Sequence, residues 1–340
     1  MRNGHGNDIY DFTTGKIIAD FSSNIPYRNH ADEIVAHLSK NLHVIKNYPD
    51  PDAKILSQLI AVRHDISPEN VLVTNGSAEA FYLTAHLFSG KKTTITYPAF
   101  AEYEDACSLH QHELSFLPVE ELKNENHKFT DTLWFALPNN PNGYILPPLY
   151  IQRICRENPK THVVIDNAYG DLCPSTSSVF PLHGDFSNLI SIHSLTKTFA
   201  IPGLRIGYIV AEREIINQLK RLQTPWSVNA LAIEAGCFVM QNYDQLLPDS
   251  ELLCSESKMF QQQLAEISNL EVIPSECNYF LVRLIEGTSA QLKQTLIQNR
   301  GILIRSADNF RGLSWQHFRL SVQSFEENQM LIEALTRIFN

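Results

Sequence analysis

The sequence predicts an α/β protein: a large domain built on a mostly parallel sheet, followed by a smaller α+β domain. Three observations support this prediction. Short apolar runs alternate with helix-like stretches from about residue 54 to residue 210, as in a sheet buried on both faces. Beyond about residue 236 the helical stretches become longer and the strand-like runs are grouped together. The length of 340 residues suits about two domains.

Composition and charge restrict the possible functions. Hydrophobic residues make up 44% of the chain and charged residues 19%, which is ordinary for a globular protein. The formal net charge is −10 and no basic run is present, so we expect no nucleic-acid partner. No apolar window approaches the ~20 residues that a membrane helix needs, and we expect no membrane partner.

The N-terminal residues and the cysteines indicate where the protein is located and whether it binds a metal. The first twelve residues, MRNGHGNDIYDF, lack the apolar core of a signal peptide, so we expect a cytoplasmic protein. The six cysteines form no CxxC pair. We therefore expect reduced core thiols and no metal site.

We divide the chain into three parts. Residues 1–45 are predicted to form an N-terminal arm and part of the small domain, residues 46–235 the large domain, and residues 236–340 the small C-terminal domain. The arm is polar and then becomes strand-like at IIADFSSN, and a helical period follows from Asp32 to Leu42. A turn-rich linker, KNYPDPDA, carries Tyr48 into the large domain.

The large domain is predicted to alternate strands and helices. The strands are Asn70–Gly76, Thr93–Pro98, Leu133–Pro138, His162–Asp166, Leu189–Ser194 and Leu204–Val210, and helices include Ala78–Phe88 and Pro148–Glu157. Ligands of parallel sheets bind outside the carboxyl ends of the strands. The polar residues at those ends are therefore the candidates for a site.

The first two strand ends offer a turn and an aromatic ring. Gly76, Ser77 and Ala78 connect a strand to a helix, so that their backbone N–H groups can bind a phosphate. A plain tight turn explains them equally well. Phe100 follows the next strand and can stack on a flat ligand, although an aromatic residue at such a place is more often part of the core.

The next two strand ends carry hydrogen-bonding groups. Asn140 in NNPNG can present its side chain to the ligand side of the sheet, or can form an ordinary Asn-Pro turn. Asp166 ends an apolar strand, where an ionised carboxylate needs a partner. Tyr169 follows three residues later.

A lysine follows the fifth strand, in the segment SLTKTFAIPGLRIGY. Lys197 lies directly behind an apolar run, among the hydroxyls of Ser194 and Thr196 and ahead of a Pro-Gly turn and Arg205. A lysine in this setting is suited to nucleophilic chemistry with a carbonyl group, and Arg205 is suited to bind a phosphate. The alternative is a surface lysine that happens to precede a turn.

One ligand needs all of these groups together. Pyridoxal phosphate requires a carboxylate at its ring nitrogen, donors at its ring oxygen, a lysine bonded to its aldehyde and a cradle for its phosphate. Asp166, Asn140 with Tyr169, Lys197, and Gly76–Ala78 with Ser194 and Arg205 supply these in turn. Each signal is weak alone, but their common order predicts this cofactor.

The C-terminal third is predicted to form the small domain. Two arginines, Arg305 in GILIR and Arg319 in HFRLSV, fall in apolar strands. A single arginine of this kind can be an edge residue whose charged end reaches solvent. Two in neighbouring strands favour an anionic ligand, and together they can bind a carboxylate and a phosphate. Helical periods run over 223–240, 246–267, 289–300 and 326–339.

The motifs TNGSAE, YPAF, NNPNG, DNAY and SLTKTFAIPGLRIGY resemble those of the fold-type I, or aspartate aminotransferase-like, pyridoxal phosphate enzymes. The resemblance covers nearly the whole chain. It implies catalytic roles for Lys197, Asp166 and Tyr169. It also implies a homodimer in which Tyr48 reaches the partner's cofactor phosphate, and a substrate carboxylate bound by Arg319. NPNG replaces the usual NPTG and leaves Asn140 in place.

Within this family the chain is similar to histidinol-phosphate aminotransferases and to threonine-phosphate decarboxylases of cobalamin biosynthesis. GHGND, DFSSNIP and ILIRSADNFRGL resemble motifs of the decarboxylases. Two departures are that the arm reads GHGN where the decarboxylases have HGGN, and that DFSSNIP lacks the second asparagine of their DFSxNxNP motif. This resemblance implies a small phosphorylated amino acid as substrate, bound by His5, Gly6, Asn24, Asn140, Arg305 and Arg319. The implied reaction is decarboxylation of L-threonine O-3-phosphate. The alternatives are a histidinol-phosphate aminotransferase and a non-catalytic protein that binds the cofactor.

Overall fold

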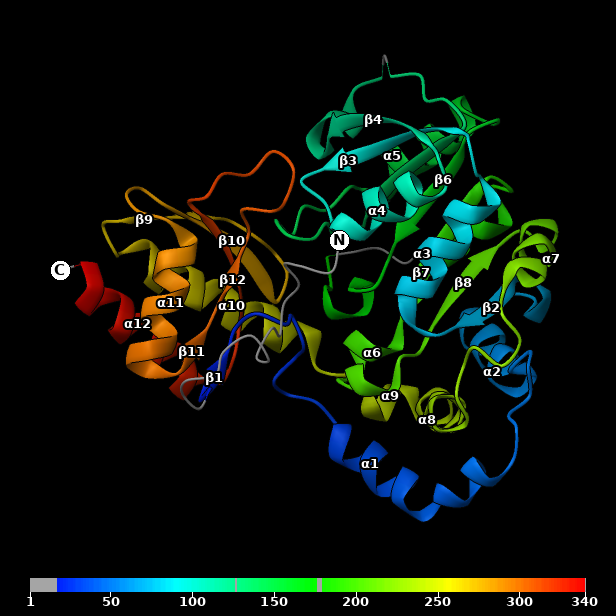
Figure 1. Cartoon of the computed structure of the whole chain (residues 1–340), viewed down its shortest axis with the longest axis horizontal. Coiled ribbons are helices and arrows are strands. Elements are labelled where there is room, and N and C mark those ends of the chain that lie inside the picture. Colours follow the sequence, from blue (N-terminus) through cyan, green and yellow to red (C-terminus); the bar gives the residue numbers. More distant parts are fainter. Residues whose placement is uncertain (1–16, 126, 176–178, 340) are drawn as a thin grey trace.

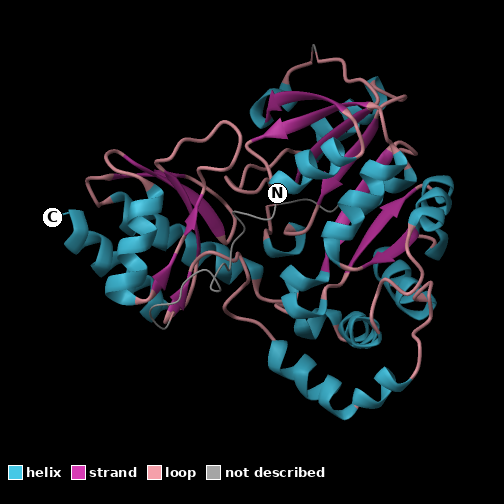
Figure 2. Ribbon diagram, in the orientation of Figure 1, coloured by secondary structure: helices cyan, strands magenta, loops and turns pink. Residues whose placement is uncertain are grey.

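The computed structural model describes residues 17–125, 127–175 and 179–339. These residues form two lobes, with the large sheet in one lobe and a small sheet with three long helices in the other (Figure 1). Helices lie on both sides of the large sheet (Figure 2). The architecture is the α/β fold with a second α+β lobe that the sequence predicts.

The large sheet has seven strands in the order β2-β8-β7-β6-β5-β3-β4. They are β2 (Val71–Thr74), β8 (Gly207–Ala211), β7 (Leu189–Ser194), β6 (His162–Asp166), β5 (Thr132–Ala136), β3 (Lys92–Tyr97) and β4 (Glu113–Pro118). All neighbours from β4 to β7 pair in parallel, and β8 pairs antiparallel with both β7 and β2. The mostly parallel sheet is confirmed.

Helices bury the faces of this sheet, which explains why its central strands are apolar throughout. The helices of the large lobe are α1 (Ala31–Lys40), α2 (Lys54–His64), α3 (Gly76–Leu87), α4 (Ala101–Leu109), α5 (Pro148–Glu157), α6 (Leu195–Thr198), α7 (Arg213–Leu222), α8 (Ala230–Gln241) and α9 (Tyr243–Leu246). Residues of α3, α4 and α7 pack on one face of the sheet and residues of α5 on the other. A further cluster joins α1, α2 and α8.

The small lobe is built on a four-stranded antiparallel sheet of order β12-β13-β10-β9. Its strands are β9 (Leu270–Ile273), β10 (Tyr279–Leu284), β12 (Arg305–Ser306) and β13 (His317–Ser321). A separate pair joins β1 (Ala19–Asp20) to β11 (Ile302–Leu303) in parallel, which ties the N-terminal segment to this lobe. The helices are α10 (Ser250–Ala265), α11 (Ser289–Arg300) and α12 (Phe325–Phe339).

Several predicted elements match the structure residue for residue, among them β6, β7, α5 and α11. The predicted strand Leu204–Val210 is wrong at its start. A 3-10 turn covers Pro202–Leu204 and Arg205 adopts a left-handed conformation with φ of 58°, so that β8 begins only at Gly207. With this turn, the Arg205 side chain lines the cavity at the ligand side of the sheet.

The core of the large lobe includes helices beyond residue 236. Residues of α8 and α9, up to Leu246, pack with α1 and α2 in the core of the large lobe. The domain boundary that we place at residue 236 remains a proposal.

None of the helices in the described part of the chain combines the length and apolar character that crossing a membrane requires.

Candidate active site

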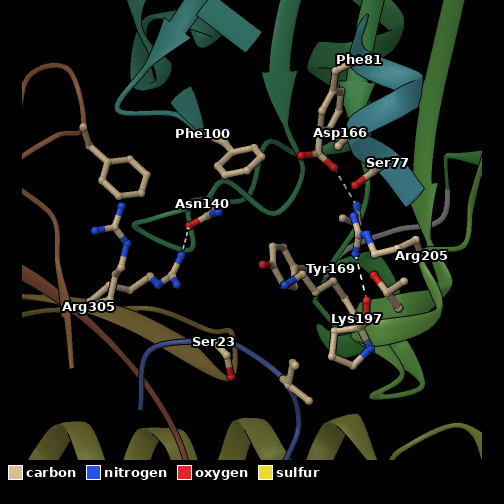
Figure 3. A pocket seen from close by; sticks show the side chains of 17 residues that line it. Ser23, Ser77, Phe81, Phe100, Asn140, Asp166, Tyr169, Lys197, Arg205 and Arg305 are labelled. Carbon is tan, nitrogen blue, oxygen red and sulfur yellow. Dashed lines mark hydrogen bonds between the residues drawn. The ribbon is translucent and has the colours of Figure 1, made fainter. Parts of the chain in front are cut away.

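A cavity of about 330 Å³ lies at the carboxyl ends of the parallel strands, where the two lobes meet. This volume is at the lower end of the range for small-molecule sites. Both lobes contribute to its wall (Figure 3). The cavity is lined by Ser23, Ile25, Ser77, Ala78, Phe81, Phe100, Asn140, Asp166, Ala168, Tyr169, Thr196, Lys197, Pro202, Arg205, Arg305, Phe310 and Arg319.

The first helical turn of α3 forms one end of the cavity. Gly76 has φ of +74°, and a Cβ atom there would lie 2.7 Å from Nη2 of Arg205. Glycine therefore lets the guanidinium lie directly against the backbone at the start of the helix. Ser77 and Arg205 lie together at this end of Figure 3. A helix N-terminus beside an arginine and hydroxyls is a suitable binding site for a phosphate.

Lys197 lies in the short helix α6 that follows β7 directly, and its side chain lines the cavity. The neighbouring hydroxyls of Ser194 and Thr196 are 2.7 Å apart. Thr196 faces the cavity, whereas Ser194 is buried behind it. The structure thus places the predicted reactive lysine between Tyr169 and the end of the cavity formed by Ser77 and Arg205 (Figure 3).

Asp166 is the carboxylate among the side chains that line the cavity, and it is 8% exposed. Its Oδ2 accepts a hydrogen bond from the Tyr103 hydroxyl, and its Oδ1 accepts one from the backbone N–H of Ala168 at 3.0 Å. Burial raises the pKa of Asp166 to about 6, although these two donors and the charge of Lys197 lower it. The sequence indicated that this carboxylate needs a partner, but it did not identify Tyr103.

Three predicted residues line the cavity between Asp166 and the small lobe. Phe100 lies near Asp166 in Figure 3, and Asn140 and Tyr169 lie between the two ends of the cavity. Asn140 is held by the tight NNPNG turn, in which Asn142 Oδ1 accepts from Asn139 Nδ2 at 2.7 Å. Asn142 thus stabilises the turn at the position of the threonine in the NPTG pattern that this segment resembles.

The two arginines of the small lobe lie side by side. Arg305 of β12 and Arg319 of β13 are direct partners in the antiparallel ladder, so that both side chains project from the same face of the sheet. Arg319 donates to Asn140 Oδ1 at 2.6 Å and to the carbonyl of Ser22 at 2.5 Å. Its buried Nε has no partner among the described residues, which leaves one donor for a ligand.

Arg305 is fixed by the loop that follows it. Its guanidinium donates to Asn309 Oδ1 at 2.8 Å and to the carbonyl of Ser306 at 2.5 Å, and it lies 5.5 Å from the centre of the Phe310 ring. Phe310 itself lines the cavity. Asn309 and Phe310, which form the NF of the motif ILIRSADNFRGL, therefore hold the Arg305 side chain in place.

Some predicted site residues lie outside the cavity wall. Tyr48 is 84% exposed and its ring lies 5.2 Å from that of Trp226, away from this chain's own cavity. Asn24 is fully buried between Ser23 and Ile25, which do line the cavity, and neither of its amide atoms has a partner among the described residues. His5 and Gly6 lie outside the described residues.

The charges and shape of the cavity fit pyridoxal phosphate. The side chains that line it include four cations (Lys197, Arg205, Arg305 and Arg319) and one carboxylate, so a ligand with several negative charges is favoured. The buried Asp166 carboxylate faces the cavity and suits a cationic ring nitrogen, and the start of α3 with Arg205, which lies against Gly76, suits a phosphate. Phe100 offers an aromatic face in the cavity wall, on the side of Asp166 away from Ser77 and Arg205 in Figure 3.

Comparison with known proteins gives consistent matches. The model of the family "Aminotransferase class I and II" matches residues 16–335. The threonine-phosphate decarboxylase of Salmonella typhimurium is 30% identical over 356 residues, which covers 99% of this chain and 97% of that protein.

Two solved structures are similar over nearly the whole fold. The L-threonine-O-3-phosphate decarboxylase from Porphyromonas gingivalis superposes with a TM-score of 0.91 and 37% identity, covering 94% of this chain and 99% of that one. The histidinol-phosphate aminotransferase from Clostridium acetobutylicum superposes with a TM-score of 0.86 and 26% identity, covering 95% and 99%. The similarity thus includes both the small lobe and the cavity.

Proposed function

The chain belongs to the aminotransferase class I and II family, and we propose that it decarboxylates L-threonine O-3-phosphate to (R)-1-amino-2-propanol O-2-phosphate. It belongs to a family of enzymes whose cofactor is pyridoxal phosphate. When bound, this cofactor supplies an electron sink for the electron pair that is left when a bond to the substrate Cα breaks. We assign its ring nitrogen to Asp166, its phosphate to the start of α3 with Arg205, and its aldehyde to Lys197.

The paired arginines of β12 and β13 carry the proposal. The cofactor phosphate is assigned to Arg205, so Arg305 and Arg319 remain for the substrate. Both are at least 95% buried and both line the cavity. Burying two cations side by side is costly unless anions accompany them. A substrate with a carboxylate and a phosphate supplies one anion for each arginine, and threonine phosphate carries both groups.

The position of the substrate decides which bond breaks. We assign the phosphate to Arg305, because its guanidinium is anchored by Asn309 and Ser306 at the far side of the cavity from Lys197 (Figure 3). The carboxylate would then leave as carbon dioxide, and the bonding electron pair would be taken up by the electron sink that the cofactor supplies when bound. Lys197 Nζ, which faces the cavity, returns a proton to Cα, so that the reaction replaces the carboxylate by hydrogen.

An aminotransferase is the second candidate. In that reaction Lys197 Nζ removes the proton from Cα instead, and Arg319 holds the carboxylate of the amino-group donor. The favouring observation is the similarity to the histidinol-phosphate aminotransferase from Clostridium acetobutylicum. The identity of 37% to the Porphyromonas gingivalis decarboxylase, against 26% to that aminotransferase, supports decarboxylation as the first candidate.

A direct assay separates the two reactions. The cofactor-loaded enzyme is incubated with carboxyl-labelled L-threonine O-3-phosphate, and released carbon dioxide is counted. In parallel it is incubated with histidinol phosphate and 2-oxoglutarate, and glutamate is measured. We expect carbon dioxide release and no glutamate. Glutamate formation without carbon dioxide release would show that the aminotransferase assignment is the correct one.

Variants of the small sheet test the role of Arg305. Replacing it in Arg305→Gln should raise KM for threonine phosphate by about 10- to 100-fold, since a charge-assisted hydrogen bond is lost. The matched control is Arg283→Gln, because Arg283 lies in β10 of the same sheet but bonds Glu271 at the surface. The control should leave KM unchanged.

We also propose that the active species is a homodimer in which Tyr48 completes the partner's cofactor site. Arg205 is exposed in the single chain, although it lines the phosphate end of the cavity. Tyr48 is itself exposed beside Trp226, and α1, α2 and the segments next to them carry further exposed apolar side chains. Trp226 is 51% exposed, and the others are Val35 (56%), Leu42 (52%), Ile45 (62%), Ile55 (64%) and Val62 (81%). An apolar surface of this kind favours a self-complementary contact.

A further inference from the structure

We propose that Tyr103 is a positioning residue for the cofactor: its hydroxyl holds the Asp166 carboxylate in the orientation that receives the ring nitrogen of pyridoxal phosphate. The inference goes beyond the proposed function, because it applies equally to a decarboxylase and to an aminotransferase. It concerns a residue of α4 that does not line the cavity, and it depends only on the cofactor.

The hydrogen bonds around Asp166 fix its carboxylate. The Tyr103 hydroxyl donates to Oδ2, and the backbone N–H of Ala168 donates to Oδ1 at 3.0 Å. Among the described residues each oxygen therefore has one donor, which restricts rotation of the carboxylate. Because Asp166 lines the cavity, the remaining lone pairs are available to a donor in it.

The ring of Tyr103 is itself immobilised by two walls of the same cavity. It packs edge-to-face against Phe81 with centroids 5.0 Å apart and against Phe100 with centroids 6.0 Å apart. Both phenylalanines line the cavity, whereas Tyr103 is 1% exposed behind them. This packing sets the position of the hydroxyl to within a narrow range. One side chain thus supports both the aromatic wall and the carboxylate.

Burial and the nearby charges determine that Tyr103, and not Asp166, holds the proton of the hydrogen bond between them. Burial and the charge of Asp166 raise the pKa of Tyr103 well above its ordinary value, so the hydroxyl keeps its proton and acts as the donor. The other ionisable groups near this pair are Lys197 from α6 and two tyrosines, Tyr169 and Tyr279. Lys197 lowers the pKa of Asp166, as does the Tyr103 hydrogen bond, and both oppose the effect of burial.

A core tyrosine that merely finds an acceptor for its hydroxyl would have the same coordinates. That role predicts an effect of Tyr103→Phe on folding stability, but no effect on the preference of the site for a ligand that carries the ring nitrogen. The positioning role predicts a loss confined to ligands that carry this nitrogen. The two roles therefore differ in a binding measurement that does not involve turnover.

The test compares two ligands on the cofactor-free full-length protein. Pyridoxal phosphate and its 1-deaza analogue, in which CH replaces the ring nitrogen, are titrated into wild type and Tyr103→Phe, and binding is followed by equilibrium dialysis. We expect Tyr103→Phe to weaken binding of pyridoxal phosphate at pH 7 by about 10- to 100-fold, the usual effect of losing a hydrogen bond to a charged group. Binding of the 1-deaza analogue should be unchanged.

The pH dependence gives a second readout. In Tyr103→Phe the Asp166 carboxylate loses a donor, so its pKa rises further. Pyridoxal phosphate affinity should increase with pH as this carboxylate ionises, and in the variant this increase should occur at higher pH than in wild type. The matched control is Tyr82→Phe, because Tyr82 of α3 also donates to a carboxylate, that of Glu102 at 3.0 Å, but does not line the cavity. The control should match wild type with both ligands.

Two results would overturn the proposal: an equal loss for both ligands, or no loss for either. If Tyr103→Phe alone does not fold, the same comparison is made in an Asp166→Asn background, where no buried charge is left without a donor. There Tyr103→Phe should cause no further loss of pyridoxal phosphate binding. A further loss in that background would show that Tyr103 does not act through Asp166.

Discussion

Replacing Asp166 by asparagine should make the cofactor-free protein more stable at neutral pH. Asp166 is 8% exposed, and burial raises the pKa of its carboxyl from 3.8 to about 6. The folded state therefore binds more protons than the unfolded state between these values, and the free energy of unfolding falls as pH rises through this interval. The shift of roughly 2 units, at about 1.4 kcal/mol each, corresponds to roughly 3 kcal/mol at pH 8.

Asparagine removes that charge but keeps the shape of the side chain. It can still accept a hydrogen bond from Ala168, and its amide can donate to the oxygen of Tyr103. We expect Asp166→Asn to raise the free energy of unfolding by roughly 1 to 3 kcal/mol at pH 8, after a discount for the altered hydrogen bonds. At pH 4 the difference should be small, and it should vanish at still lower pH, where the carboxyl, with a pKa of 3.8 in the unfolded state, becomes neutral in both states.

Urea unfolding of the cofactor-free proteins at pH 4 and pH 8, at one fixed protein concentration, measures this difference. Asp185→Asn is the control, because Asp185 is exposed, and it should behave like wild type. A variant that is less stable than wild type at pH 8, or a difference that is the same at both pH values, would refute the reasoning. With pyridoxal phosphate added, the order should reverse, since wild type binds the cofactor more tightly.

Three further predictions follow from the site. Lys197→Ala should abolish turnover and the visible absorbance of the covalently bound cofactor, whereas Arg205→Ala should retain that absorbance but weaken cofactor binding by about 10- to 100-fold in dialysis. Tyr48→Ala and Lys197→Ala, each inactive alone, should regain activity when mixed under subunit exchange; an active monomer in sedimentation would contradict this. Burial lowers the pKa of His64 to about 4, so between pH 6.5 and pH 4 acid should cost up to ~3 kcal/mol of stability, and His64→Gln should flatten that part of the urea profile.

The sequence located most of the large-lobe site because each group follows a strand end. In a parallel sheet all such ends meet at one edge, so that order along the chain is enough to bring Ser77, Phe100, Asn140, Asp166 and Lys197 together. The cavity that these residues line confirms that step. Adjacency of the two small-lobe arginines was predicted in the same way, from two neighbouring strands, and their pairing in the ladder confirms it.

The supporting residues could not be predicted in this way, because they act across the fold. Tyr103 lies between Glu102 and Glu104 in a helix that the sequence did not reveal, and a local pattern of this kind is typical of a solvent-exposed helix face. Its partner Asp166 is 63 residues away. The edge strand β4 was missed for a related reason: it is only partly buried and therefore lacks the continuous apolar run of the central strands.

The division of the site between two lobes bears on why one fold serves two reactions. The groups that we assign to the cofactor, from Ser77 to Arg205, belong to the large lobe, while Arg305 and Arg319 belong to the small sheet. A change in the small lobe can therefore turn the substrate without disturbing the cofactor. Each ~1.4 kcal/mol between two transition states is a factor of ten in rate, so the contacts of one arginine are enough to change the bond that breaks. Small-lobe residues such as Asn309 and Phe310, which hold Arg305, are thus the places where substitutions should redirect the reaction.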